Sequence, residues 1–96
     1  MDDVTITRHD HRGAGEYHAA VTGSEHIGRL TWVKRGDTRV ADHTLVPGEI
    51  GGRGIAAKLV AAMVADARQH GFRIDPQCSY VAAAFKRHPD WADLLA

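Results

Sequence analysis

The spacing of apolar residues changes once along this chain, across residues 47–54, and that change restricts the fold more than any other feature. Before it, apolar and polar residues alternate in short runs separated by glycine-containing turns, which is typical of antiparallel strands. After it, apolar residues recur every three or four positions, which predicts a helix. Strands followed by a helix-rich half indicate an α+β domain.

Four strands are expected in the first half, joined by short turns into an antiparallel meander. The first two run over residues 4–7 and 16–21, with the turn residues RGAGE between them, and TGSE ends the second. The third lies in HIGRLTWVKRG, which closes at a glycine-containing loop typical of a hairpin. The fourth is TRVADHTLV, which ends at Pro47-Gly48.

The second half begins with a helix that starts at Ile55 and is expected to end at Gly71, where a C-terminal cap belongs. One side of this helix carries the residues expected to face the core, and the other side carries polar residues. The core-facing residues are Ile55, Ala56, Leu59, Val60, Met63, Val64 and Ala67, and the polar ones are Lys58, Asp66, Arg68 and Gln69. FRID then predicts a short strand that Pro76 stops.

A second helix is expected over SYVAAAFKRH, with Ser79 in the capping position and the His-Pro pair ending it. DWADLLA then predicts one amphipathic turn that lays Trp91, Leu94 and Leu95 on the core. The predicted order is ββββαβα, and the crossover helix makes the fourth and fifth strands parallel. The length of 96 residues favours a single domain spanning 1–96.

Composition and charge narrow the possible partners and location. The formal net charge is zero, which removes the electrostatic reason to expect nucleic acid. No apolar run approaches the roughly 20 residues that a bilayer crossing needs, so no membrane partner is expected. The start MDDVTITRHD does not resemble a signal peptide, and a single cysteine suits a reducing compartment. We expect a cytoplasmic protein, and the sequence is compatible with an oligomer.

Seven histidines are many for a chain of this length, and His9 and His11 stand two residues apart. In a strand that spacing puts both rings on one face, where they can in principle hold a metal ion. No third ligand is fixed by local spacing. Solvated histidines are therefore the preferred interpretation, and no metal is expected.

The helix that begins at Ile55 has an unusual start. It follows GGRG, its first turn contains no acid, and Arg53 and Lys58 add positive charge where the helix dipole is already positive. The first N–H groups of a helix lack partners, and N–H groups on a glycine-lined turn bind phosphate. An anion is the favoured occupant. The alternative is that glycine alone caps the helix while Glu49 offsets the charge.

Two phosphate-binding motifs can be compared with this turn directly. The Walker pattern is not matched, because no Gly-Lys-Ser/Thr occurs. The dinucleotide pattern G-x-G-x-x-[GA] is matched by Gly52, Gly54 and Ala57, with Asp75 where a ribose partner would stand. A dinucleotide fold places this motif after its first strand, whereas a meander precedes it here. Dinucleotide binding is therefore kept as an alternative.

The stretch from His43 to Leu95 resembles the small acetyltransferase-like proteins of the GNAT superfamily, in which HT.V, a glycine-rich turn, a helix, P.C and HP recur in this order. In that family the motif [QR]-x-x-G-x-[GA] binds the pyrophosphate of coenzyme A through backbone N–H groups. Gly51, Gly54 and Ala56 occupy its three defined places, and Gly51 departs from the Gln or Arg of the family. The resemblance implies a minimal GNAT-like fold with splayed fourth and fifth strands, and acetyl-CoA as co-substrate.

The same resemblance implies which residues meet acetyl-CoA. Its pantetheine arm would lie along the fourth strand, where a backbone N–H also meets the thioester oxygen. The implied contacts are Thr44, Leu45, Val46, Gly51, Gly52, Arg53, Gly54, Ile55, Ala56, Lys58 and Ser79.

Three side chains are candidates for the chemistry. His43 is the candidate base for an ammonium substrate, or a packing histidine. Cys78 precedes the second helix, whose N-terminus favours a thiolate, and the resemblance implies a nucleophile there; inert packing is the alternative. Tyr80 is the candidate acid for the departing thiolate of coenzyme A, or a packed aromatic residue.

The expected function is acetyl transfer from acetyl-CoA to an amine, either directly or through acetyl-Cys78. Full-sized GNAT domains carry helices between their first strands, and this chain has only turns there. We therefore expect an open acceptor site that suits a macromolecular amine or a partner subunit. The alternative is a regulatory module that binds coenzyme A and transfers nothing.

Overall fold

The computed structural model describes residues 3–96, which form one mixed sheet with helices. The strands are β1 (Val4–His11), β2 (Ala14–Val21), β3 (Ile27–Arg35), β4 (Thr38–Leu45) and β5 (Arg73–Pro76). The helices are α1 (Ile55–His70) and α2 (Ser79–Arg87), and the short 3-10 helices are η1 (Gly48–Ile50) and η2 (Pro89–Leu94). The predicted α+β class and the order ββββαβα are confirmed.

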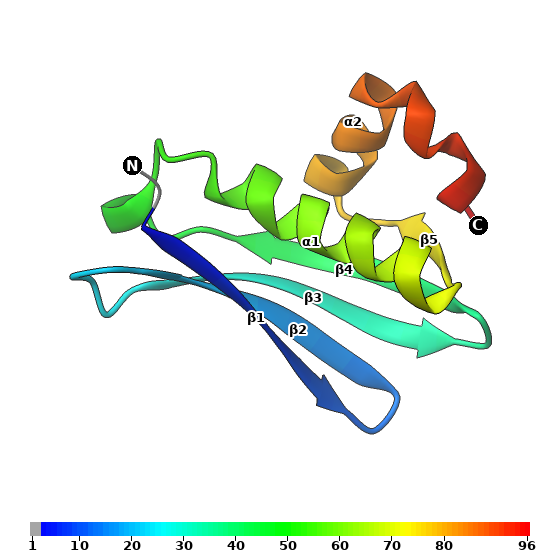
Figure 1. Ribbon diagram of the computed structural model, residues 1–96, viewed down its shortest axis with the longest axis horizontal. Helices are drawn as coiled ribbons and strands as arrows, with labels where there is room; N and C mark the ends of the chain where they lie inside the picture. The colour runs from blue at the N-terminus through cyan, green and yellow to red at the C-terminus, as the bar shows by residue number, and fades with distance from the viewer. Residues whose placement is uncertain (1–2) are drawn as a thin grey trace.

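The sheet has the strand order β1-β2-β3-β4-β5, so neighbours in space are neighbours in sequence (Figure 1). The first four strands pair antiparallel, and β5 pairs parallel with β4 after the α1 crossover. β4 and β5 stay paired only from Thr38↔Arg73 to Ala41↔Pro76. The meander, the βαβ unit and the splayed fourth and fifth strands are therefore all present.

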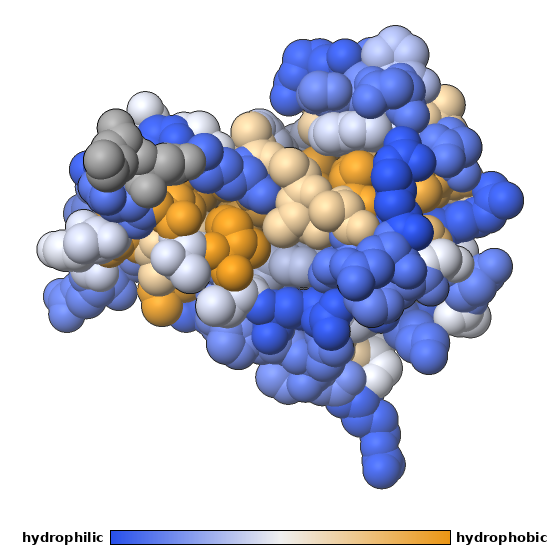
Figure 2. Space-filling model, in the orientation of Figure 1, coloured by the Kyte–Doolittle hydropathy of each residue, from blue (hydrophilic) through white to orange (hydrophobic). Residues whose placement is uncertain are grey.

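The hydrophobic core lies between one face of the sheet and the helices. α1 packs across β1, β2 and β3, while α2 packs on β5 and β4 (Figure 1). The face of α1 that was predicted to be apolar supplies much of this core, with Leu59, Val60 and Met63 almost fully buried. In Figure 2 hydrophilic residues surround a band of apolar residues, tan to orange, that crosses the middle of this face where α1 lies.

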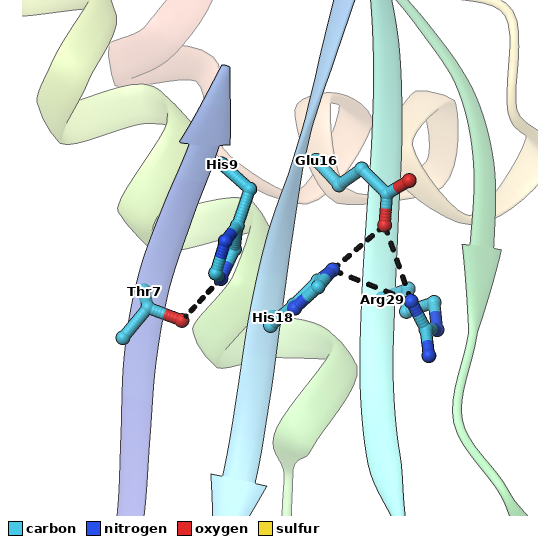
Figure 3. A network of polar contacts seen from close by, with 5 residues as sticks. All are labelled: Thr7, His9, Glu16, His18 and Arg29. Carbon is cyan, nitrogen blue, oxygen red and sulfur yellow. Dashed lines mark hydrogen bonds and ion pairs between the residues drawn. The ribbon is translucent and has the colours of Figure 1, made fainter. Parts of the chain in front are cut away.

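The opposite face of the sheet carries polar side chains and is not covered by either helix. In Figure 3 the side chains from β1, β2 and β3 lie in front of the strands, and the helices lie behind them. We call this side of β1 to β4 the open face. The predicted absence of helices between the first strands leaves it exposed. Within residues 3–96 no helix is long and apolar enough to cross a membrane.

The boundaries of the first two strands were predicted wrongly. β1 continues to His11 rather than ending at Thr7, and β2 begins at Ala14 rather than at Glu16. The two strands pair up to His11↔Ala14, and Gly13 makes the turn with a φ of 73°. The end of β1 reads Arg-His-Asp-His and has no apolar alternation, so backbone pairing alone extends it.

Three details at the helices also differ from prediction. Ser79 is the first residue of α2 rather than its cap, and Cys78 is the N-cap. The N–H of Cys78 donates to the carbonyl of Ala41 at 2.9 Å, which holds Cys78 extended so that the helix begins one residue later. Ala56 is only half-buried. Leu95 is 37% exposed, because its backbone follows β5 in a bridge with Ile74 rather than completing a turn on the core.

Candidate active site

The glycine turn leads the chain from η1 into α1. Gly52 and Gly54 have φ values of 76° and 68°, a region in which a side chain is strained. A Cβ atom built on either residue would have no neighbouring atom within 4 Å, so the space beside both is open. Gly54 is the N-cap of α1, no side-chain hydrogen bond closes it, and the first turn holds no acid. The turn therefore presents unsatisfied N–H groups at the positive end of a helix.

Gly51 has a different part in this turn. Its N–H donates to the carbonyl oxygen of Gly48 at 3.1 Å and closes η1. A Cβ atom at Gly51 would lie 3.3 Å from that same oxygen, which explains why glycine suits the place. We call the glycine turn with the start of α1 the cradle. The N–H groups of the cradle that remain available to a ligand are therefore those that follow Gly51. Arg53, within that segment, is exposed.

β4 has an open outer edge beside the glycine turn. The N–H groups of Gln77 and Cys78 both donate to the carbonyl of Ala41, at 3.0 and 2.9 Å, and this turns the chain away from β4. Residues 42–45 of β4 consequently have no pairing with β5. An open strand edge offers backbone donors and acceptors to an extended ligand.

Cys78 lies in the gap between the two strands and is half-buried. Its thiol donates to Oγ1 of Thr44 at 3.4 Å. Burial alone would raise the pKa of this thiol, but hydrogen bonds from Thr44 and from backbone groups of Val81 and Tyr80 outweigh burial and lower the pKa below its ordinary value. The site thus makes the thiolate, the nucleophilic form of cysteine, easier to form than in an ordinary thiol.

A β-bulge decides which side chain of β4 meets Cys78. The register between β3 and β4 shifts at Thr31/Trp32, where Asp42 is the extra residue. After the shift His43 pairs with Thr31 and Thr44 with Leu30, so His43 lies on the open face and Thr44 on the side of the core. The structure therefore brings Thr44, and not His43, to the thiol.

His43 lies instead in a pocket of about 280 Å³ on the open face. The other residues that line this pocket are Arg29, Thr31, Thr44 and Leu45. Leu45 is 62% exposed and gives the pocket an apolar wall. Thr44 lines this pocket and also contacts Cys78, so one residue separates the pocket from the thiol.

Tyr80 and Ser79 lie in the first turn of α2, after Cys78. Tyr80 is partly buried against the core, and the guanidinium of Arg87 lies 5.9 Å from its ring centroid. Ser79 is exposed. Both residues are therefore close in sequence to the thiol. For Tyr80, the alternative of a packed aromatic residue also fits its position against the core.

A polar network on the open face was missed by the sequence analysis. Nε2 of His18 lies 2.7 Å from Oε1 of Glu16, and Nη1 of Arg29 lies 3.3 Å from the same oxygen (Figure 3). The hydrogen bond with His18, above all, lowers the pKa of Glu16. The alternation within β2 and β3 predicts that these polar side chains share one face of the sheet, but it does not predict which of them form hydrogen bonds or ion pairs with each other.

Of the two histidines near the start of the chain, His9 takes part in the same network. His9 lies 2.9 Å from Oγ1 of Thr7, and its ring centroid is 4.0 Å from that of His18. In the part of the chain that the structure describes, no three His, Cys, Asp or Glu side chains gather as metal ligands. His11 is exposed at the end of β1.

The comparison with protein families agrees with this architecture. The model of a family described as GCN5-related N-acetyl-transferase matches residues 16–94, from β2 to the end of η2. No match was found among curated proteins. The match covers β2 to β5, the glycine turn, Cys78 and both α-helices, and β1 lies outside it. The chain belongs to the GCN5-related N-acetyltransferase family.

Proposed function

We propose that this protein transfers an acetyl group from acetyl-CoA to an amine by way of Cys78. Membership of the family supports acetyl transfer in general. The observation that carries the covalent route is the Cys78 thiol, which contacts Thr44 beside the open edge of β4 and has a lowered pKa. A direct attack of the amine would not need such a thiolate.

The glycine turn and the β4 edge fit the two ends of acetyl-CoA. The N–H groups from Gly52 to Ala56 would hold the pyrophosphate, with the positive charge of Arg53 nearby. The unpaired edge of β4 at Thr44 and Leu45 would hydrogen-bond the amides of the pantetheine arm. These two features adjoin one another, and Cys78 lies at the end of the β4 edge.

The residues around Cys78 suit a two-step transfer. The Cys78 thiolate attacks the thioester carbonyl carbon, a backbone N–H of the β4 edge stabilises the oxygen, and the carbon–sulfur bond to coenzyme A breaks. Tyr80 donates a proton to the departing thiolate. The acceptor amine then attacks the acetyl carbon, the bond to the Cys78 sulfur breaks, and His43 takes the ammonium proton.

The acceptor would approach from the open face. The pocket of His43 lies there, with Thr44 between it and Cys78, whereas the glycine turn lies at the start of α1. Neither α1 nor α2 covers this face, so a large acceptor has access to it. This supports a macromolecular amine rather than a small enclosed one.

A thermal-shift comparison of acetyl-CoA, NAD and ATP tests the proposal. A ligand at a hundredfold excess over its Kd stabilises a protein by about 2.7 kcal/mol, and about 1 kcal/mol moves the melting temperature of a small domain by roughly 4–8 °C. We expect a large shift with acetyl-CoA only. No shift with acetyl-CoA would overturn the proposal, and a shift with NAD alone would favour the dinucleotide alternative.

A further inference from the structure

Arg39 has an unusual environment near the hairpin that joins β3 and β4. Its guanidinium carbon lies 4.1 Å from the ring centroid of Trp32 and 4.0 Å from that of Phe72. Trp32 and Phe72 are 4% and 7% exposed, so both rings are fixed in the core. Two fixed rings hold the guanidinium in one plane, which removes most of the side-chain freedom that an arginine loses on binding.

The charge of Arg39 is not matched by a carboxylate. Arg8, Arg29 and Arg68 each form an ion pair with an acid. Arg39 forms none with any residue from 3 to 96, and its Nη1 atom is buried without a hydrogen-bond partner there. A buried donor without a partner costs free energy, so an acceptor at this place is strongly favoured.

A pocket of about 240 Å³ adjoins this guanidinium. It lies between the β3–β4 hairpin and the C-terminal end of α1, and its lining includes Lys34, Asp37, Arg39 and His70. Lys34 pairs with Arg39 across the ladder and forms no ion pair with residues 3–96. Two unpaired cations therefore face one pocket, against the single carboxylate of Asp37.

We propose that this pocket binds a carboxylate group of a small molecule. The flat edge of a guanidinium matches the two oxygens of a carboxylate, and Lys34 adds a second charged donor. Asp37 and the carbonyl groups at the end of α1 repel negative charge, so a singly charged carboxylate fits better than a doubly charged phosphate. Arg39 and Lys34 both line the pocket, so one carboxylate can meet both cations there.

This site is separate from the proposed acetyl-CoA cleft. Arg39 and Thr44 are five residues apart on β4, and Cys78 contacts Ala41 and Thr44 but does not line the Arg39 pocket. The pocket lies at the hairpin end, whereas Cys78 lies where β4 and β5 part. The inference is therefore independent of acetyl transfer.

An NMR titration of the full chain tests this inference. The chain has two tryptophans: Trp32 contacts Arg39, and Trp91 packs on Phe85 and His88 outside the pocket, so their indole N–H signals serve as reporter and reference. We expect acetate, at ionic strength held constant with sodium chloride, to move the Trp32 signal saturably and to leave the Trp91 signal in place. Inorganic phosphate should bind more weakly.

Two variants and one control sharpen the test. Lys34→Gln alters an exposed side chain, and Arg39→Lys keeps the charge while losing the planar fork. Each should weaken acetate binding by at least about tenfold, as expected for a lost charge-assisted hydrogen bond. Arg35→Gln, on the same hairpin but 72% exposed and paired with Asp75, should leave it unchanged. No saturable Trp32 shift, tighter binding of phosphate, or equal binding in Lys34→Gln would overturn the proposal.

Discussion

The thiol of Cys78 lies 3.4 Å from Oγ1 of Thr44, at the point where β4 and β5 part. This contact joins the three parts of the site. Cys78 caps α2, Thr44 belongs to the open edge of β4, and the pocket beyond Thr44 holds His43. A conservative change at Thr44 should therefore alter the pKa of the Cys78 thiol more than it alters the stability of the fold.

Thr44→Val should raise the pKa of Cys78 and slow its alkylation near neutral pH. The hydroxyl stabilises the thiolate, and valine keeps the shape while removing that hydrogen bond. The rate of iodoacetamide reaction as a function of pH measures the midpoint, which should lie below the ordinary thiol value in the wild type and move upward in the variant. Thr31→Val, whose hydroxyl donates to Asp42 at 2.6 Å, is the control and should leave the midpoint unchanged.

Gly54→Ala should abolish most of the stabilisation by acetyl-CoA. The methyl group enters the open space of the cradle and forces a left-handed residue to carry a Cβ, at about 1 kcal/mol. Gly71→Ala is a matched control, because Gly71 has a φ of 78°, open space around it, and a place at the other end of α1. Both variants should lose similar melting temperature, and equal acetyl-CoA shifts in the two would argue against the cradle.

Tyr17→Phe should destabilise the fold by about 1 kcal/mol, because the Tyr17 hydroxyl donates to Oδ2 of Asp66 at 2.7 Å. Burial, followed by this hydrogen bond, raises the pKa of Tyr17 well above its ordinary value. The native state then holds the proton longer than the unfolded chain, so the unfolding free energy should fall as pH rises above about 10. Urea titrations across that pH range should show this fall in the wild type, and a fall of the same size in Tyr17→Phe would contradict the assignment.

His43→Gln should leave acetylation of Cys78 intact and slow transfer to an amine by roughly a hundredfold, the usual loss for a general base. His11→Gln, on the same face of the sheet but outside the pocket, should change neither step. Single-turnover kinetics with pre-acetylated protein separate the two steps. A normal rate of transfer in His43→Gln would remove His43 from the mechanism.

The order of elements could be predicted because two strong signals agree. The change of period marks the border between strands and helix, and the glycine turn marks the start of α1 at Ile55. Gly71 at the end of α1 is in the left-handed conformation that its capping role requires. These signals are local, so a single sequence displays them.

The contacts of the site could not be predicted, because a single bulge sets them. Strict alternation along β4 from Ala41, with no bulge at Asp42, would place His43 on the side of the core and Thr44 on the open face. The bulge exchanges the two, so Cys78 meets a hydroxyl rather than an imidazole. Likewise, the position of Arg39 between Trp32 and Phe72 depends on residues from β3, β4 and the end of α1, which no local pattern relates.

Intact-mass measurement after incubation with acetyl-CoA tests the central claim most directly. The account predicts that the wild-type protein gains one acetyl group, that peptide mapping places it on Cys78, and that an added amine removes it. Cys78→Ala should gain none while keeping its thermal shift with acetyl-CoA. A wild-type protein that binds acetyl-CoA but never carries acetyl on Cys78 would contradict the covalent route, and the absence of any transfer to amines would leave a binding module.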